Sequence, residues 1–153
     1  MNKIIEMFSK ACEYSIKIMV YMAVCQRDNV RVGLKEVASA INSPEPFTAK
    51  ILQQLVRQGL LVSFKGPNGG FFLERPADKV LLREIVEKID GPSLIDTCVL
   101  GFKNCSGEKP CPIHHKYKPI KEMIQNELLS VSIAQIDKGI IEGLGNLKDA
   151  LEA

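Results

Sequence analysis

Hydrophobic residues recur at intervals of three or four along the first part of the chain, which predicts an amphipathic helix from about residue 10 to Gln26. Ser9 is a suitable N-cap, because its side-chain oxygen can accept a hydrogen bond from an N–H of the first turn. The hydrophobic stripe is wide, so we expect the helix to be buried on most sides. Cys12 and Cys25 lie on this helix and are interpreted as small core side chains.

Two shorter patterns of the same period follow. Leu34 to Ile41 predicts a second helix and Phe47 to Val56 a third, with Pro46 at the first position of the third helix, where its missing N–H costs nothing. Gly59 is the expected stop of the third helix. The sequence Asn-Ser-Pro at 42–44 is typical of a tight turn between the two. Together these segments predict a helix-turn-helix.

The pattern changes after Gly59. Leu60 to Phe64 and Phe71 to Leu73 are typical of short strands, and the six residues between them include three glycines and a proline. This combination indicates a β-hairpin, so the segment is predicted to be a winged helix. A further helix, capped by Asp78, is expected to end at Gly91.

The third helix and the hairpin are where we expect contacts to DNA. The second helix of a helix-turn-helix enters the major groove, and a wing can lie along the minor groove. Residues 46–73 contain Lys50, Arg57 and Lys65 but no acidic residue, so this segment carries +3 and the rest of the chain −1. The net charge of +2 therefore hides a basic face. Phe47 shares the hydrophobic step of its helix and is interpreted mainly as a core residue. The candidate DNA contacts are Pro46, Phe47, Thr48, Lys50, Gln53 and Gln54 on the helix and Lys65, Asn68 and Gly69 on the hairpin.

Hydrophobic periodicity disappears between residues 92 and 115, where Cys98, Cys105 and Cys111 occur with the spacing C-x6-C-x5-C. An irregular loop of this length in a compact chain is usually functional. Thiolates are soft ligands that select zinc, copper(I) or iron–sulfur groups. Structural zinc sites usually take their ligands from close C-x2–4-C pairs, so the wider spacing favours an inorganic cluster.

Other interpretations of this loop stay open. Lys103, Lys109 and Lys116 would lower the pKa of nearby thiols, so a metal-free thiol switch or a zinc site is the alternative. His114 follows the last cysteine in C-x2-H spacing and is either a further ligand or a polar residue at a helix start.

After the loop, apolar positions from Ile120 to Ile136 predict one long helix that continues to about Lys138. No domain core remains for it to cover, so we expect it to contact a second copy of the chain. The predicted fold is mostly α with a small β-hairpin wing. The predicted organisation is a winged helix-turn-helix DNA-binding domain at 1–91, a cysteine loop at 92–115, and a dimerisation helix with a C-terminal tail at 116–153.

Composition narrows the class of protein further. The 153 residues are 46% hydrophobic and 25% charged, which excludes wholesale disorder. The longest apolar run, Ile18 to Cys25, is too short for a membrane span, and charged residues near the N-terminus do not fit a signal peptide. Five cysteines, an odd number, predict a reducing cytoplasm rather than a disulfide framework. A redox enzyme or electron carrier that uses the same cysteines is the less favoured alternative, because nothing indicates a substrate pocket or a flavin fingerprint. We therefore expect no enzyme activity and no small-molecule substrate.

Several segments together resemble one known family. They are the Glu13-Tyr14 pair, the sequence Pro-Glu-Pro-Phe at 44–47 through Gly59, the wing sequence KGPNGGFFL at 65–73, and the three-cysteine loop. In these segments, which span nearly the whole chain, the protein resembles the winged-helix iron–sulfur regulators of the Rrf-two family (IscR- and NsrR-like regulators).

The resemblance implies a homodimer, held by the long C-terminal helix, that binds a double-stranded DNA operator under the control of a two-iron or four-iron cluster. The implied signal is redox state, nitric oxide or iron–sulfur status. The three cysteines would be ligands together with a variable fourth. The fourth corresponds either to His114 or to Glu13 supplied by the other subunit, and this sequence offers both. Cluster type and signal therefore stay open, with zinc or no metal as alternatives.

Overall fold

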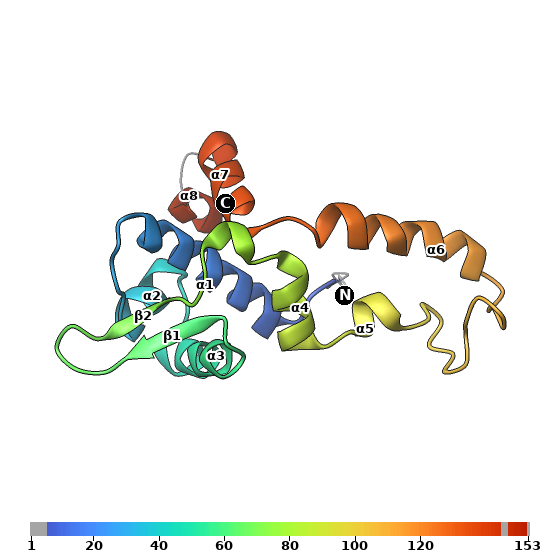
Figure 1. Ribbon diagram of the computed structural model, residues 1–153, viewed down its shortest axis with the longest axis horizontal. Coiled ribbons are helices and arrows are strands. Elements are labelled where there is room, and N and C mark those ends of the chain that lie inside the picture. The colour runs from blue at the N-terminus through green and yellow to red at the C-terminus, as the bar shows by residue number, and fades with distance from the viewer. Residues whose placement is uncertain (1–5, 145–146, 153) are drawn as a thin grey trace.

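The computed structural model describes residues 6–144 and 147–152. A central helix, α1, contacts α2, α3, α4, α7 and strand β2, and a second group of elements extends away from it (Figure 1). We call residues 10–90, 133–144 and 147–152 the body, and residues 93–128 the arm. The helices and strands of the body are α1 (Lys10–Arg27), α2 (Leu34–Ala40), α3 (Glu45–Arg57), β1 (Leu61–Phe64), β2 (Gly70–Leu73), η1 (Ala77–Lys79), α4 (Leu82–Asp90), α7 (Ile133–Leu144) and α8 (Leu147–Glu152), and those of the arm are α5 (Ser93–Asp96), α6 (His114–Met123) and the π-helical turn η2 (Ile124–Leu128).

The first helix begins where the sequence predicts. Ser9 is its N-cap, and the Ser9 hydroxyl oxygen accepts a hydrogen bond from the Cys12 N–H at 3.1 Å. Cys12 and Cys25 are both buried, which confirms their assignment to the core. Burial also raises the pKa of the Cys12 thiol to about 12, so this thiol stays neutral and inert.

The helix-turn-helix and the wing are confirmed. Asn42 takes a positive φ of 51° in the turn between α2 and α3, and Gly59 takes a φ of 70° after α3. Strands β1 and β2 are antiparallel, with Leu61 opposite Leu73. Backbone hydrogen bonds between Val32 and Phe71 add a one-residue bridge, so strand β2 is hydrogen-bonded on both of its edges, to β1 and to Val32. This bridge ties the wing to the segment just before α2.

The helix before the arm starts differently from the prediction. Asp78 lies in η1 and does not cap α4, which begins at Leu82 without a side-chain cap. Instead, the N–H groups of Leu82 and Arg83 donate to the carbonyls of Val131 and Leu129, at 2.8 and 3.0 Å. A distant segment therefore satisfies the backbone groups that a capping side chain would otherwise satisfy.

The predicted continuous helix to about Lys138 is also wrong in its extent. The chain leaves the helix after η2, pairs Ser132 with Leu81, and restarts at Ile133 in α7. Leu129 and Ile133 are fully buried on either side of this break. Burying both side chains against the body requires the chain to turn, so the helix is interrupted where these two residues pack into the core. Helix α7 thus joins the body, packing on α1, and of this last apolar pattern only α6 and η2 belong to the arm.

The arm is anchored at its base by a second small core. Cys12, Leu82, Val86 and Leu129 form this cluster, and Leu94 and Ile124 of the arm are among the side chains packed against it, while Phe8 and Ile16 also contact it. In the described part of the chain, no helix is long and apolar enough to cross a membrane.

Candidate metal centre and nucleic-acid interface

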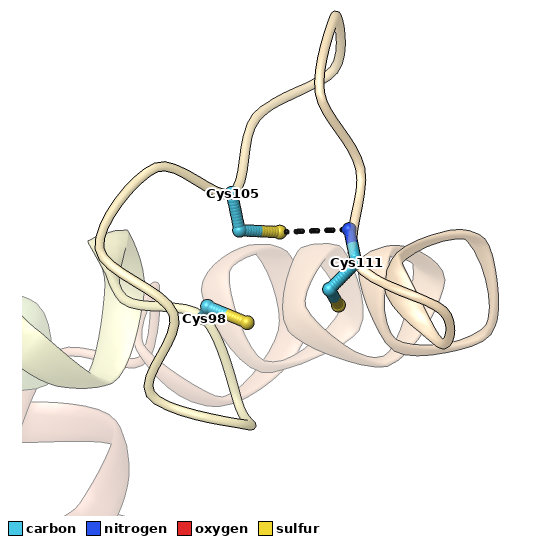
Figure 2. Close-up of side chains that lie close together, drawn as sticks. All are labelled: Cys98, Cys105 and Cys111. Atoms are coloured by element: carbon cyan, nitrogen blue, oxygen red, sulfur yellow. Dashed lines mark hydrogen bonds between the residues drawn. The ribbon is translucent and has the colours of Figure 1, made fainter.

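The three cysteines of the loop meet in space. Cys98, Cys105 and Cys111 place their sulfur atoms within 4.8 Å of one another, between α5 and the start of α6 (Figure 2). The Cys111 N–H donates to the Cys105 sulfur at 3.3 Å. Residues separated by as many as thirteen positions are thus brought to one point by a loop without regular structure. The three cysteines that the sequence offers as candidate ligands thus lie close together in the fold.

His114 lies next to this group. Its Nδ1 atom is 3.2 Å from the Cys105 sulfur. This approach is possible because α6 begins at His114, three residues after Cys111. A pocket of about 340 Å³ opens beside the thiols and is lined in part by Tyr117, Lys118 and Lys121. The Lys121 ammonium donates to the Thr97 carbonyl at 3.1 Å, which fixes the start of the loop against α6.

The thiols differ in their acidity. Burial opposes ionisation of Cys98, but hydrogen bonds from the N–H groups of Phe102 and Leu100 and from the neighbouring thiols lower its pKa to about 7. Backbone donors, rather than the lysines named from the sequence, are thus the leading groups that favour the Cys98 thiolate. At Cys105 the Cys111 N–H lowers the pKa, yet burial and the adjacent thiols outweigh it and the pKa is raised. Thiolates this close repel one another, so a cation is needed to hold all three ionised.

These donors fit the group that their chemistry implies. Three thiols whose sulfur atoms lie within 4.8 Å of one another match the soft sulfur ligand set of zinc or an iron–sulfur group. Among the described residues, Glu13 does not belong to this set of mutually close donors. Its carboxylate accepts a hydrogen bond from Lys10 at 3.2 Å on the first turn of α1. Within one chain, His114 rather than Glu13 lies at the thiols.

The face of α3 presents most of its predicted DNA contacts. Pro46, Lys50 and Gln53 are exposed, and Gln54 is half-buried. Phe47 packs edge-on against Tyr14, with ring centroids 5.2 Å apart, as expected of a core residue.

Thr48 is 0% exposed, which contradicts a DNA contact through its side chain. Its hydroxyl donates to the Pro44 carbonyl at 3.0 Å, one turn back along the chain. The residue therefore satisfies a polar group inside the helix-turn-helix, since α3 turns this position toward the body.

The tip of the wing projects from the body (Figure 1). Lys65 and Asn68 are exposed there, while Gly69 is half-buried. A Cβ atom at Gly69 would collide with the carbonyl of Phe64, so only glycine fits this tight turn. The three candidate residues of the wing thus lie together at the tip, where a duplex can reach them.

Two basic residues that the sequence analysis did not single out lie near the tip. Arg31 and Lys35 line a groove of about 1,100 Å³ that runs from the first turn of α3, at Glu45, to the wing at Asn68. No local pattern marks Arg31, because its neighbours in the groove are distant in sequence. This groove between the wing and α2 is lined by two basic residues, Arg31 and Lys35, and by two acidic residues, Glu36 and Glu45.

A winged helix joined to a group of three close thiols is the arrangement of a DNA-binding transcriptional regulator with a candidate metal site. The model of the Rrf2 family, described as iron-dependent transcriptional regulators, matches residues 8–138. The chain belongs to this family, as its resemblance predicted. It is therefore a transcriptional regulator and not an enzyme.

Individual relatives agree with this assignment. A provisionally assigned HTH-type transcriptional regulator of Aquifex aeolicus is 32% identical over 131 residues, which cover 84% of this chain and 90% of the relative. The regulator IscR of Xenorhabdus nematophila is 25% identical over 125 residues, covering 82% of this chain and 75% of the relative.

Solved structures show the same fold. CymR, the global cysteine regulator of B. subtilis, superposes with a TM-score of 0.71 at 21% identity, covering 84% of this chain and 94% of CymR. IscR of T. potens gives a TM-score of 0.65 at 23% identity, with 88% of each chain covered. The mostly α winged-helix fold with its hairpin is thereby confirmed.

Proposed function

We propose that this chain is a homodimeric, sequence-specific DNA-binding regulator whose operator affinity is set by an iron–sulfur cluster held by Cys98, Cys105 and Cys111. The observation that carries the proposal is the convergence of these three sulfur atoms within 4.8 Å on an arm joined to a winged helix. A bound cluster supplies a centre whose charge and integrity respond to oxidants and to small reactive ligands. The chain's own residues then pass the state of the loop to the DNA-binding surface.

Operator binding is assigned to the exposed face of α3 and to the wing tip. Lys50 and Lys65 contact phosphate or guanine, and Gln53 and Gln54 read base edges. Pro46, Asn68 and Gly69 shape the approach of the backbone to the duplex, and Phe47 holds α3 against α1 through Tyr14. Support for this assignment comes from exposure and charge, since Lys50, Gln53 and Lys65 are exposed and Gln54 is partly exposed.

Dimerisation is assigned to the arm. Ile120, Met123 and Leu128 are exposed by 52%, 65% and 38%. Ile120 and Met123 are three residues apart in α6, a spacing that places them on one face of this helix. Large apolar side chains at this exposure on an extended helix are typical of a surface that a partner covers. A second copy of α6 is the self-complementary partner that two-fold symmetry provides.

The route from the loop to α3 runs through α4. The Ser9 N–H donates to the Asp90 carboxylate at 2.9 Å, joining the end of α4 to the start of α1. The Lys88 ammonium donates to the Gln58 carbonyl at 2.6 Å, directly after α3. A change in the loop that follows α4 can therefore shift α3 relative to the α3 helix of the partner subunit. A coupling free energy of about 1–3 kcal/mol between the cluster site and the DNA-binding surface changes operator affinity roughly 5- to 150-fold.

Metal content tests the site. Protein purified without air is expected to contain iron and acid-labile sulfide and to be coloured. Cys105→Ala should lose both while the dimer stays folded. Cys25→Ala, a buried thiol on α1, is the matched control and should keep them. A Cys105→Ala protein with full iron and sulfide would defeat the proposed site.

His114 is proposed as the fourth ligand because it touches Cys105. His114→Ala should then reduce iron loading and shift the absorption spectrum, whereas Glu13→Ala should change neither. The opposite result would assign this role to Glu13 of the partner subunit.

DNA binding is tested on duplexes selected from a random library. Lys50→Ala and Lys65→Ala should each weaken binding and reduce the slope of log affinity against log salt by about one. Lys79→Ala, an exposed lysine paired with Asp78 on η1, is the control and should change little. Unchanged binding in the Lys50 and Lys65 variants would reject this interface.

Zinc is the second candidate, favoured by the close approach of the thiols. Three thiolates around one tetrahedral ion at about 2.3 Å would lie roughly 3.8 Å apart, which the 4.8 Å grouping accommodates. A metal-free thiol switch needs the same proximity. Metal analysis separates the three: iron with sulfide, zinc, or neither.

A further inference from the structure

Arg31 makes a set of contacts with the wing that its position in the sequence does not suggest. Its guanidinium carbon lies 4.0 Å from the centre of the Phe64 ring and 5.7 Å from that of Phe72. The two rings stack on each other with centroids 5.3 Å apart. Both distances from Arg31 fall within the range in which a cation is attracted to an aromatic face.

The same side chain also reaches the tip of the hairpin. An Nη1–H of Arg31 donates to the carbonyl of Asn68 at 3.3 Å. The neighbouring residue, Val32, exchanges backbone hydrogen bonds with Phe71. Arg31 thus contacts both strands of the hairpin and the turn between them, from a segment that leads directly into α2.

A two-stranded hairpin is marginal by itself in water, so its tip needs such support to hold one position. Phe64 remains 38% exposed, and the ring therefore does not pack into the body to anchor the wing. The base of the wing is fixed by Leu61 and Leu73, which are buried. Beyond this base, the contacts of Arg31 and the backbone bridge of Val32 tie the hairpin to the body.

We propose that Arg31 is a positioning residue for DNA binding, which clamps the wing against the segment before α2 through Phe64, Phe72 and the Asn68 carbonyl. The clamp sets the distance between Lys65 at the tip and α3, so the duplex meets both without first ordering the hairpin. Ordering a flexible segment on binding lowers affinity, and a clamped wing avoids this loss. This inference rests on the proposed operator binding through the wing.

The free protein provides the first test. Amide hydrogen exchange of residues 65–70 should become about 3- to 10-fold faster in Arg31→Ala. Arg31→Lys keeps the charge but loses the planar stacking group, so it should resemble Arg31→Ala. Lys35→Ala lies in the same groove and is the control that should leave exchange unchanged. Exchange in Arg31→Ala equal to that of the wild type would overturn the clamp.

Phe64→Leu extends the test to the partner of Arg31. It should loosen the tip by a similar factor, and the double variant should be no looser than either single variant, because both remove the same contact. Independent, multiplicative effects would show that Arg31 and Phe64 act separately and would reject the clamp.

DNA affinity separates positioning from direct phosphate contact. Arg31→Ala should bind the selected duplex about 3- to 10-fold more weakly with an unchanged salt slope. A slope reduced by about one would make Arg31 a phosphate contact instead and overturn the proposal. If the wild-type protein bound no duplex at all, the proposed function would fail, while the exchange result would still decide whether the clamp exists.

Discussion

Gly70, the first residue of β2, is a position where a single methyl group should damage the wing. Its φ is 139°, a conformation that L residues rarely adopt. A Cβ atom here would lie 2.8 Å from the Val32 carbonyl oxygen and 3.0 Å from its carbon. Both neighbours are backbone atoms, so they can move only if the bridge between Val32 and Phe71 opens.

The expected cost of Gly70→Ala follows from these two effects. A strained backbone conformation costs about 1–3 kcal/mol. The two hydrogen bonds of the bridge, at 2.8 and 3.3 Å, contribute about 0.5–1.5 kcal/mol each. Because relaxation recovers part of the sum, we expect a loss of about 2–4 kcal/mol in the free energy of unfolding.

Urea denaturation measures this loss, and Gly59→Ala is the matched control. Gly59 also has a positive φ, of 70°, but a Cβ there meets nothing within 4 Å. Its substitution should cost only about 1–2 kcal/mol. Folded Gly70→Ala should also bind the selected duplex more weakly than Gly59→Ala. If the two variants were equally stable and bound DNA equally, the close approach of Gly70 to Val32 would not constrain the wing.

Three further predictions concern the body and the arm. Burial opposes ionisation of Glu84, but hydrogen bonds from Arg75 and a neighbouring lysine prevail and lower the pKa of Glu84 below 4.5. The stability that the ionised Glu84 contributes is therefore present above pH 4.5 and is lost as the pH falls through the lowered pKa of the folded state. Glu84→Gln should therefore cost about 0.5–1 kcal/mol at pH 7 and flatten the acid limb of a stability–pH curve, whereas an unchanged limb would refute the pairing. Ile133→Ala should lower the free energy of unfolding, measured in urea, by about 2–4 kcal/mol because Ile133 is fully buried. Ile120→Ala, at an exposed position, should leave stability nearly unchanged but weaken self-association in sedimentation. Equal losses of stability in the two variants would contradict these positions. Thr48→Val should cost about 1 kcal/mol in stability without changing operator affinity, and a tenfold loss of affinity would restore Thr48 as a DNA contact.

The local elements of the DNA-binding half follow from short-range rules. The start of α1 at Ser9, the turn at Asn42 and the stop at Gly59 each depend on residues within a few positions of one another, so they can be read along the chain. The hairpin follows from the glycines between two apolar runs for the same reason. Capping and turn preferences are local free energies, and here the tertiary structure agrees with them.

The metal site was predictable in its chemistry but not in its shape. Residue type alone marks Cys98, Cys105 and Cys111 as candidate soft ligands. The hydrophobic pattern of α1 assigns Cys12 to the core instead and so excludes it from this group. Their approach to within 4.8 Å depends on a loop without periodicity. The acidity of Cys98 likewise depends on which backbone N–H groups the loop turns toward it.

By itself, the sequence determined the winged-helix class, the three candidate thiol ligands and the basic character of the α3–wing segment, because composition, period and spacing are properties of the chain alone. Only the tertiary structure decided that the last long apolar pattern divides between Leu129 and Ile133, that Thr48 faces inward, and that Arg31 reaches the wing. Each of these depends on contacts between segments distant in sequence. The free energy of burying Leu129 and Ile133 against the body exceeds that of continuing a helix, and no local pattern records that competition.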